Sequence, residues 1–237
     1  MTVSSHTAAE PPRSRDSTVK NPEPQDGRAS PAHPVPQLLS AAGVAAGPFF
    51  LTASLAQGLT RDGFDFTRNA FSQLSLGTLG WIQITVFLLT GLLIIGGAIA
   101  LHQMLRDTPG GTWAPRLLAV FGASFLIAGL FSADPGAGFP AGAPEDRATS
   151  LSTHGTVHLL AGTVGYLALC AAFLVFARHF AASRQRRWAL AARLLPAGVL
   201  AGFVASTITV MAFTAGAALG LLALSALISH LALRRRC

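Results

Sequence analysis

An acidic residue and two histidines stand between two long apolar runs of this chain. Asp134 ends one run, and His154 and His158 open the next. The histidines are four residues apart, so on a helix they share one face. Ionisable groups at the edge of a membrane-spanning segment are costly and often functional. These three residues are therefore the first candidates for a site.

Four roles fit these residues, and the sequence leaves them open. Asp134 or His158 can hydrogen-bond loop backbone and hold segment 134–153 in place, since buried polar groups need partners. Asp134 and His158 can act as a catalytic acid/base pair. With His154 they can bind zinc, although Gly155 stands where the common hydrolytic zinc motif has glutamate. The fourth role is a transport pathway.

The elements that must position these residues are long apolar runs. The chain has 237 residues, of which 51% are hydrophobic and 11% charged, whereas a soluble domain has about 25% charged residues. Backbone polar groups in lipid must be satisfied internally, so apolar runs of about 20 residues form helices. The sequence thus predicts an all-α polytopic membrane helix bundle over residues 37–234. Its six transmembrane spans are expected at about residues 38–59, 79–105, 115–133, 154–180, 188–210 and 213–233.

Basic residues predict the orientation of these spans. If alternate loops lie on opposite sides, 14 of the 17 basic residues fall on one side, and Arg61, Arg68 and Arg147 on the other. The positive-inside rule then places both termini in the cytoplasm. It also favours two spans after Trp188, with a turn near 211–216, over one broken helix. The arginines cluster at the ends of apolar runs, so the formal charge of +7 does not indicate a nucleic-acid partner.

Residues 1–36 differ from the rest of the chain. They contain seven of the fourteen prolines and no apolar run, which predicts a disordered cytoplasmic tail. Abundant Ala, Gly and Arg favour a bacterial source, and the predicted location is the bacterial inner (cell) membrane. Gly198, Gly202 and Ser206, and Gly216 with Gly220, form rows of small residues. We expect these rows to pack within one bundle, and the oligomeric state stays open.

Two loops on the predicted outer side, residues 60–78 and 134–153, are expected to roof a polar pocket. The expected lining residues are Asn69, Ser72, Asp134, His154 and His158. The histidine face of the fourth span continues through small residues, Ala161, Gly162 and Gly165, which suit a helix contact. The opposite face suits lipid, with Val157, Leu160, Val164 and Leu167. The histidines are therefore expected to point into the bundle.

Several motifs occur in an order typical of one family. They are Ser75-Leu76-Gly77-Thr78-Leu79-Gly80-Trp81, Asp134-Pro135, Gly138-Phe139-Pro140 and His154-Gly155 with His158. With these motifs the chain, over about residues 38–230, resembles the bacterial multi-pass membrane proteins catalogued as domain of unknown function 998 (DUF998). The resemblance implies a six-helix integral membrane protein and no established activity.

The leading functional hypothesis is non-catalytic. It holds that a membrane protein in the lipid bilayer binds a lipid, a small amphiphile or a partner through the outward pocket, because no complete catalytic motif is present. The first alternative is a membrane-embedded enzyme on a lipid-like substrate that uses Asp134 and His158. The second is a small transporter, which is disfavoured because no charged residue sits in the middle of a span. No cofactor is expected other than the zinc ion of the metal hypothesis.

Overall fold

The computed structural model describes residues 1–2, 34–146 and 150–235. Most of the predicted tail lies outside the described residues, as do Arg147 and Arg236. Within the described ranges there are helices and no named strand. The α-helices are α1 (Pro34–Thr60), α2 (Gly80–Met104), α3 (Trp113–Leu130), α4 (Thr153–Ala182), α5 (Arg186–Ala205) and α6 (Val210–Arg234), and a short 3-10 helix, η1 (Phe71–Ser75), precedes α2.

All six α-helices are long and apolar enough to cross a membrane. This confirms the predicted all-α, multi-pass membrane architecture. On the side of α4 that was expected to face lipid, Leu160, Val164 and Leu167 are each more than half exposed, and Val157 is partly buried. In a membrane protein such side chains lie against lipid tails, so their exposure carries no penalty.

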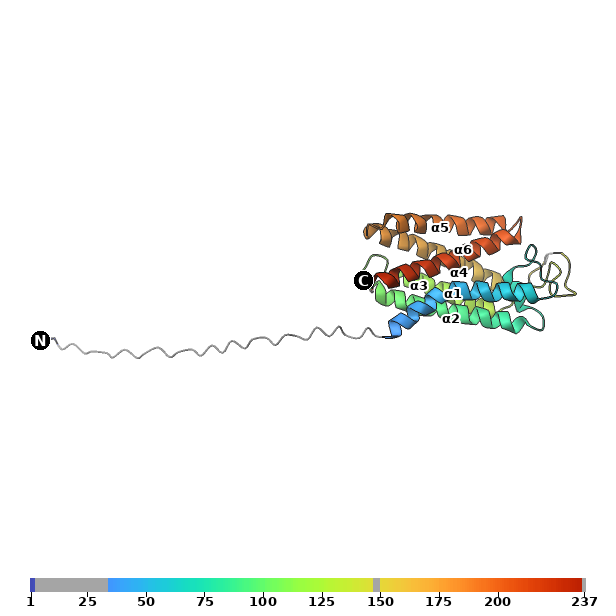
Figure 1. The fold of residues 1–237 in the computed structure, drawn as a ribbon, viewed down its shortest axis with the longest axis horizontal. Helices are drawn as coiled ribbons and strands as arrows, with labels where there is room; N and C mark the ends of the chain where they lie inside the picture. The colour runs from blue at the N-terminus through green and yellow to red at the C-terminus, as the bar shows by residue number, and fades with distance from the viewer. Residues whose placement is uncertain (3–33, 147–149, 236–237) are drawn as a thin grey trace. The chain divides into compact units, whose positions relative to one another are not determined.

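The helices close into a ring. Each helix packs against the next one in the sequence, and α6 returns to pack against α1 (Figure 1). The long loops, residues 61–79 and 131–152, and the short α5–α6 turn lie at one end of the ring, which we call the loop end. The turns 105–112 and 183–185 lie at the other end. Because chain order and neighbour order agree, every loop joins adjacent antiparallel helices.

The turn between the last two helices lies at residues 206–209, upstream of the predicted position near 211–216. Hydroxyl side chains explain the difference, because they compete with the backbone for hydrogen bonds. Ser206 Oγ donates to the Phe203 carbonyl, and Thr207 Oγ1 donates to that of Val204. Thr209 then caps α6, since its hydroxyl accepts from the Met211 amide at 3.3 Å.

Glycines allow close approach of helix backbones inside the ring. A Cβ on Gly202 would lie 2.8 Å from the Cα of Gly216, and one on Gly43 would lie 2.7 Å from the Cα of Gly97. The first pair joins α5 to α6, and the second joins α1 to α2. The predicted small-residue rows therefore pack within the bundle, as expected.

Candidate functional site

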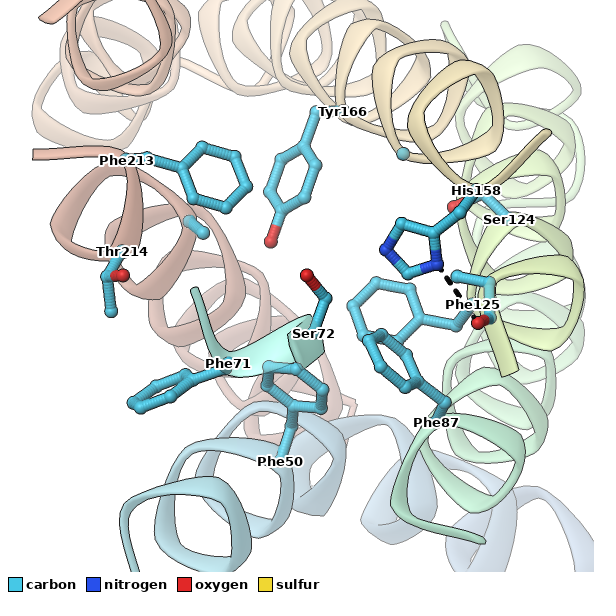
Figure 2. Close-up of a pocket in the computed structure, with 13 residues that line it drawn as sticks. Phe50, Phe71, Ser72, Phe87, Ser124, Phe125, His158, Tyr166, Phe213 and Thr214 are labelled. Atoms are coloured by element: carbon cyan, nitrogen blue, oxygen red, sulfur yellow. Dashed lines mark hydrogen bonds between the residues drawn. The ribbon is translucent and has the colours of Figure 1, made fainter. Parts of the chain in front are cut away.

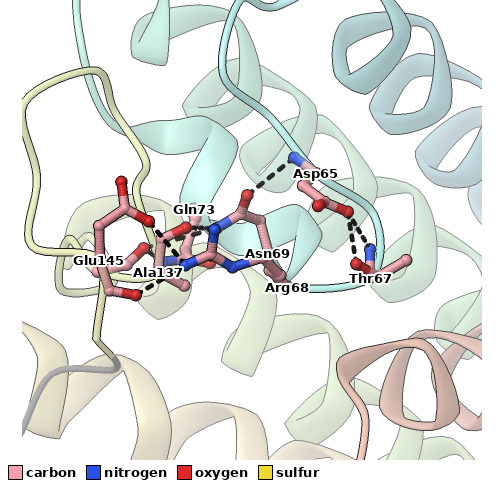
Figure 3. A network of polar contacts seen from close by, with 8 residues as sticks. Asp65, Thr67, Arg68, Asn69, Gln73, Ala137 and Glu145 are labelled. Atoms are coloured by element: carbon pink, nitrogen blue, oxygen red, sulfur yellow. Dashed lines mark hydrogen bonds and ion pairs between the residues drawn. The ribbon is translucent and has the colours of Figure 1, made fainter.

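The two long loops are clasped together by amide side chains at the loop end (Figure 3). Asn69 is only 1% exposed. Its Nδ2 donates to the Ala137 carbonyl at 3.2 Å, while its Oδ1 accepts from the Asp65 amide at 2.9 Å. Gln73 Nε2 donates to the Gly136 carbonyl at 3.0 Å. Buried amides that satisfy backbone groups of another segment fix that segment in place, so the loops form one cap.

Charged side chains reinforce the cap at its surface. Arg68 pairs with Glu145 at 2.9 Å, and both side chains are exposed. Arg61 donates to the Leu74 and Leu76 carbonyls, and partial burial holds the pKa of this guanidinium below its usual range. Hydrogen bonds from the Thr67 hydroxyl and amide lower the pKa of Asp65. These contacts tie loop residues to one another.

Asp134 lies against the N-terminus of α4. Its Oδ2 accepts from the Ser152 amide at 3.0 Å, and Ser152 caps α4 by accepting from the Gly155 amide. The carboxylate lies on the face of Gly155, where any Cβ would overlap it. A carboxylate at a helix N-terminus is favoured by the helix dipole. Asp134 thus anchors the end of the 131–152 loop, and no hydrogen bond joins it to His158 among the described residues.

The two histidines of α4 occupy different environments. His158 lies between α3 and α4, with Nδ1 at 2.8 Å from the Phe131 carbonyl and 3.1 Å from that of Ala128. These carbonyls end α3 and lack helical partners, so Nδ1 carries the proton and donates to them. His154 lies one turn nearer the loop and is exposed, with its ring against Phe131. Only His158 therefore enters the bundle.

Fixing the proton on Nδ1 leaves Nε2 of His158 as an acceptor. This nitrogen faces a cavity inside the loop-end half of the ring (Figure 2). The cavity, of about 80 Å³, is walled mainly by aromatic rings, including Phe50, Phe87 and Phe125. The three phenylalanines contact one another at centroid distances of 5.2 to 5.7 Å. We call this space the inner cavity.

A second space adjoins the inner cavity. This lateral groove, of about 320 Å³, runs between α4 and the loop-end parts of α5 and α6, where it is lined by Leu159, Thr163 and Val210. Leu159 is 55% exposed, so the groove opens at the outer surface of the bundle beside α4. Its volume is within the range of about 300 to 1,000 Å³ usual for ligand pockets.

Three polar groups stand where the groove meets the inner cavity. Ser72 on η1 and His158 and Tyr166 on α4 line both spaces, and their polar atoms point toward its centre (Figure 2). Tyr166 is only 9% exposed, yet its hydroxyl has no hydrogen-bond partner among the described residues. The Ser72 hydroxyl and His158 Nε2 likewise lack partners in the described part of the chain. These three groups are open to the cavity and the groove and are therefore available to a ligand.

The five residues expected to line one pocket therefore lie in different environments. Ser72 and His158 line the inner cavity and the groove. Asn69 is enclosed in the loop clasp, Asp134 borders a separate surface hollow, and His154 is exposed. Among the described residues no three His, Cys, Asp or Glu side chains come together as a metal site.

Sequence reasoning did not single out Tyr166. The signal was present, because Tyr166 is the single tyrosine of the chain and follows His158 by eight residues. That spacing keeps it close to the same helix face. Its role depends on Phe213 and Ser72, which only the fold brings to the same cavity.

Comparison with known families agrees with this architecture. A family model described as protein of unknown function (DUF998) matches residues 44–235. The chain belongs to this family. A search of curated proteins and a search of solved structures gave no match. As a DUF998 protein with six membrane-spanning helices, the chain is an integral multi-pass membrane protein.

Proposed function

We propose that this DUF998 protein binds a lipid-like amphiphile inside its helix ring. The single observation that carries the proposal is the aromatic inner cavity joined to a groove that opens beside the exposed Leu159 of α4. An apolar ligand can reach this site from the bilayer without crossing the polar cap. The proposal needs no catalytic group.

The cap favours entry of the ligand from the bilayer over entry from water. Asn69 and Gln73 hold the two loops together over the loop end, whereas the groove is bordered by the exposed side chain of Leu159. An apolar molecule would therefore enter the cavity more easily through the groove than through the cap. If both termini are cytoplasmic, as the arginines predict, the groove opens to the outer leaflet of the bacterial inner membrane.

Gly162 provides a direct test. It lines both spaces, and a Cβ built on it meets no atom within 4 Å. Gly162→Phe therefore fills the site without displacing backbone. Val164→Phe adds a ring of the same size on the lipid-facing side of α4, where Val164 is 53% exposed, and serves as the matched control.

The assay is native mass spectrometry of protein extracted gently from its membrane. Wild-type protein and the Val164→Phe control should carry a bound amphiphile, and Gly162→Phe should lose at least about nine-tenths of it. Thermal unfolding checks that all three proteins are folded. Equal retention by the two phenylalanine variants would show that the ligand binds elsewhere, and absence of any bound amphiphile from wild-type protein would remove the proposal.

A further inference from the structure

The three polar groups at the junction of groove and cavity restrict the ligand's head group. Ser72 and Tyr166 offer hydroxyls that donate or accept, whereas His158 Nε2 is an acceptor in the neutral ring, because Nδ1–H is used by the α3 carbonyls. No Lys, Arg, Asp or Glu is among the described residues that line either space. The site is thus polar but uncharged.

We infer that the ligand is an uncharged amphiphile whose head group carries a hydroxyl. This inference rests on the proposed function and names the ligand class of the same site. A hydroxyl can donate to His158 Nε2 and accept from both Tyr166 and Ser72, which would give a partner to all three groups. The alkyl chain then lies in the groove, against Leu159 and Val210.

Two neighbouring ligand classes fit less well. A carboxylate or phosphate would find no Lys or Arg among the described lining residues to pair with its charge, and burial of an unpaired charge is costly. An ether of the same length lacks the proton that Nε2 requires. The site should therefore prefer an alcohol to both an anion and an ether.

The size of the inner cavity agrees with this assignment. The inner cavity, at about 80 Å³, is much smaller than the groove. It therefore suits a small head group such as a hydroxymethyl group. The larger groove of about 320 Å³ takes the apolar chain.

The experiment measures equilibrium binding of three labelled probes to the full-length protein in phosphatidylcholine nanodiscs. The probes are 1-hexadecanol, its methyl ether and hexadecanoate, with empty nanodiscs as the partition control. The alcohol should bind at least about five- to tenfold more tightly than the ether, the effect of one neutral hydrogen bond. Hexadecanoate should bind more weakly than the alcohol at pH 8.

Tyr166→Phe and Ser72→Ala remove hydroxyls and leave the side-chain shape almost unchanged. Each should weaken alcohol binding about five- to tenfold and should weaken ether binding as well, because an ether oxygen accepts the same hydrogen bond from these hydroxyls. Thr85→Val is the control, because the Thr85 hydroxyl is exposed and bonds within its own helix. It should change neither probe.

The outcomes distinguish failure of the hydroxyl assignment from failure of the proposed amphiphile binding. If all three probes bind equally well and Gly162→Phe blocks them, the cavity binds amphiphiles but the hydroxyl assignment is wrong. Tighter binding of hexadecanoate would also overturn that assignment. If no probe binds wild-type protein above the empty nanodiscs, both proposals fail.

Discussion

Gly155 tests the role that the structure gives to Asp134. In Gly155→Ala the new methyl group would overlap the Asp134 carboxylate, with Oδ1 only 2.9 Å away and Oδ2 nearer still. The carboxylate must move, which breaks its hydrogen bond from the Ser152 amide. The substitution should therefore destabilise the protein, although alanine is a better helix former than glycine.

The magnitude follows from two opposing contributions. A hydrogen bond to a charged group contributes about 1.5 to 3 kcal/mol to the free energy of unfolding. Replacing Gly by Ala within a helix raises that free energy by about 0.5 to 1 kcal/mol. Gly155→Ala should therefore lower the free energy of unfolding by about 1 to 2 kcal/mol. In an Asp134→Ala background nothing remains to overlap, so the same change should be neutral or stabilising. The coupling energy between the two sites should be about 1.5 to 3 kcal/mol.

The assay is reversible unfolding in mixed micelles, with wild-type protein, both single variants and the double variant measured together. Gly162→Ala is the control, because its methyl group enters open space and should stabilise α4 by up to about 1 kcal/mol. Additive effects of Gly155→Ala and Asp134→Ala would refute the reasoning. They would show that Asp134 does not anchor α4.

Two further predictions concern the cap and the orientation. Asn69→Ala should lower the free energy of unfolding by about 2 kcal/mol, since it leaves buried backbone groups unpaired. Glu145→Gln, which breaks an exposed ion pair, should cost less than about 1 kcal/mol in the same unfolding assay. For the orientation, Asp65→Cys in a cysteine-free background should react with a membrane-impermeant thiol reagent on intact cells. Arg186→Cys should react only after the membrane is opened, and the reverse pattern would invert the topology.

The sequence was sufficient for the elements themselves. Six apolar runs predict six helices because backbone in lipid has no other way to satisfy its hydrogen bonds. The spacing of His154, His158, Ala161, Gly162 and Gly165 predicted which face of α4 turns inward, because a helix has a fixed period. The prediction was wrong for His154, which is exposed. The resemblance through Asp134-Pro135 and His154-Gly155 agreed with the family match over residues 44–235.

Tertiary structure decided what each polar residue does. His154 and His158 are equivalent by spacing, but α3 ends at Leu130 and its terminal carbonyls lie beside His158. Asp134 ends the span before the histidines and was expected at the same depth as they are, yet it contacts the α4 N-terminus instead.

The cavity exists because α6 returns to α1 and because η1 inserts Ser72 opposite Tyr166. These placements depend on contacts between segments far apart in the chain, which local periodicity does not encode. The sequence therefore determined a six-helix membrane protein with an inward-facing histidine. Only the packing of the ring determined that this histidine, with Tyr166 and Ser72, faces a space of ligand size.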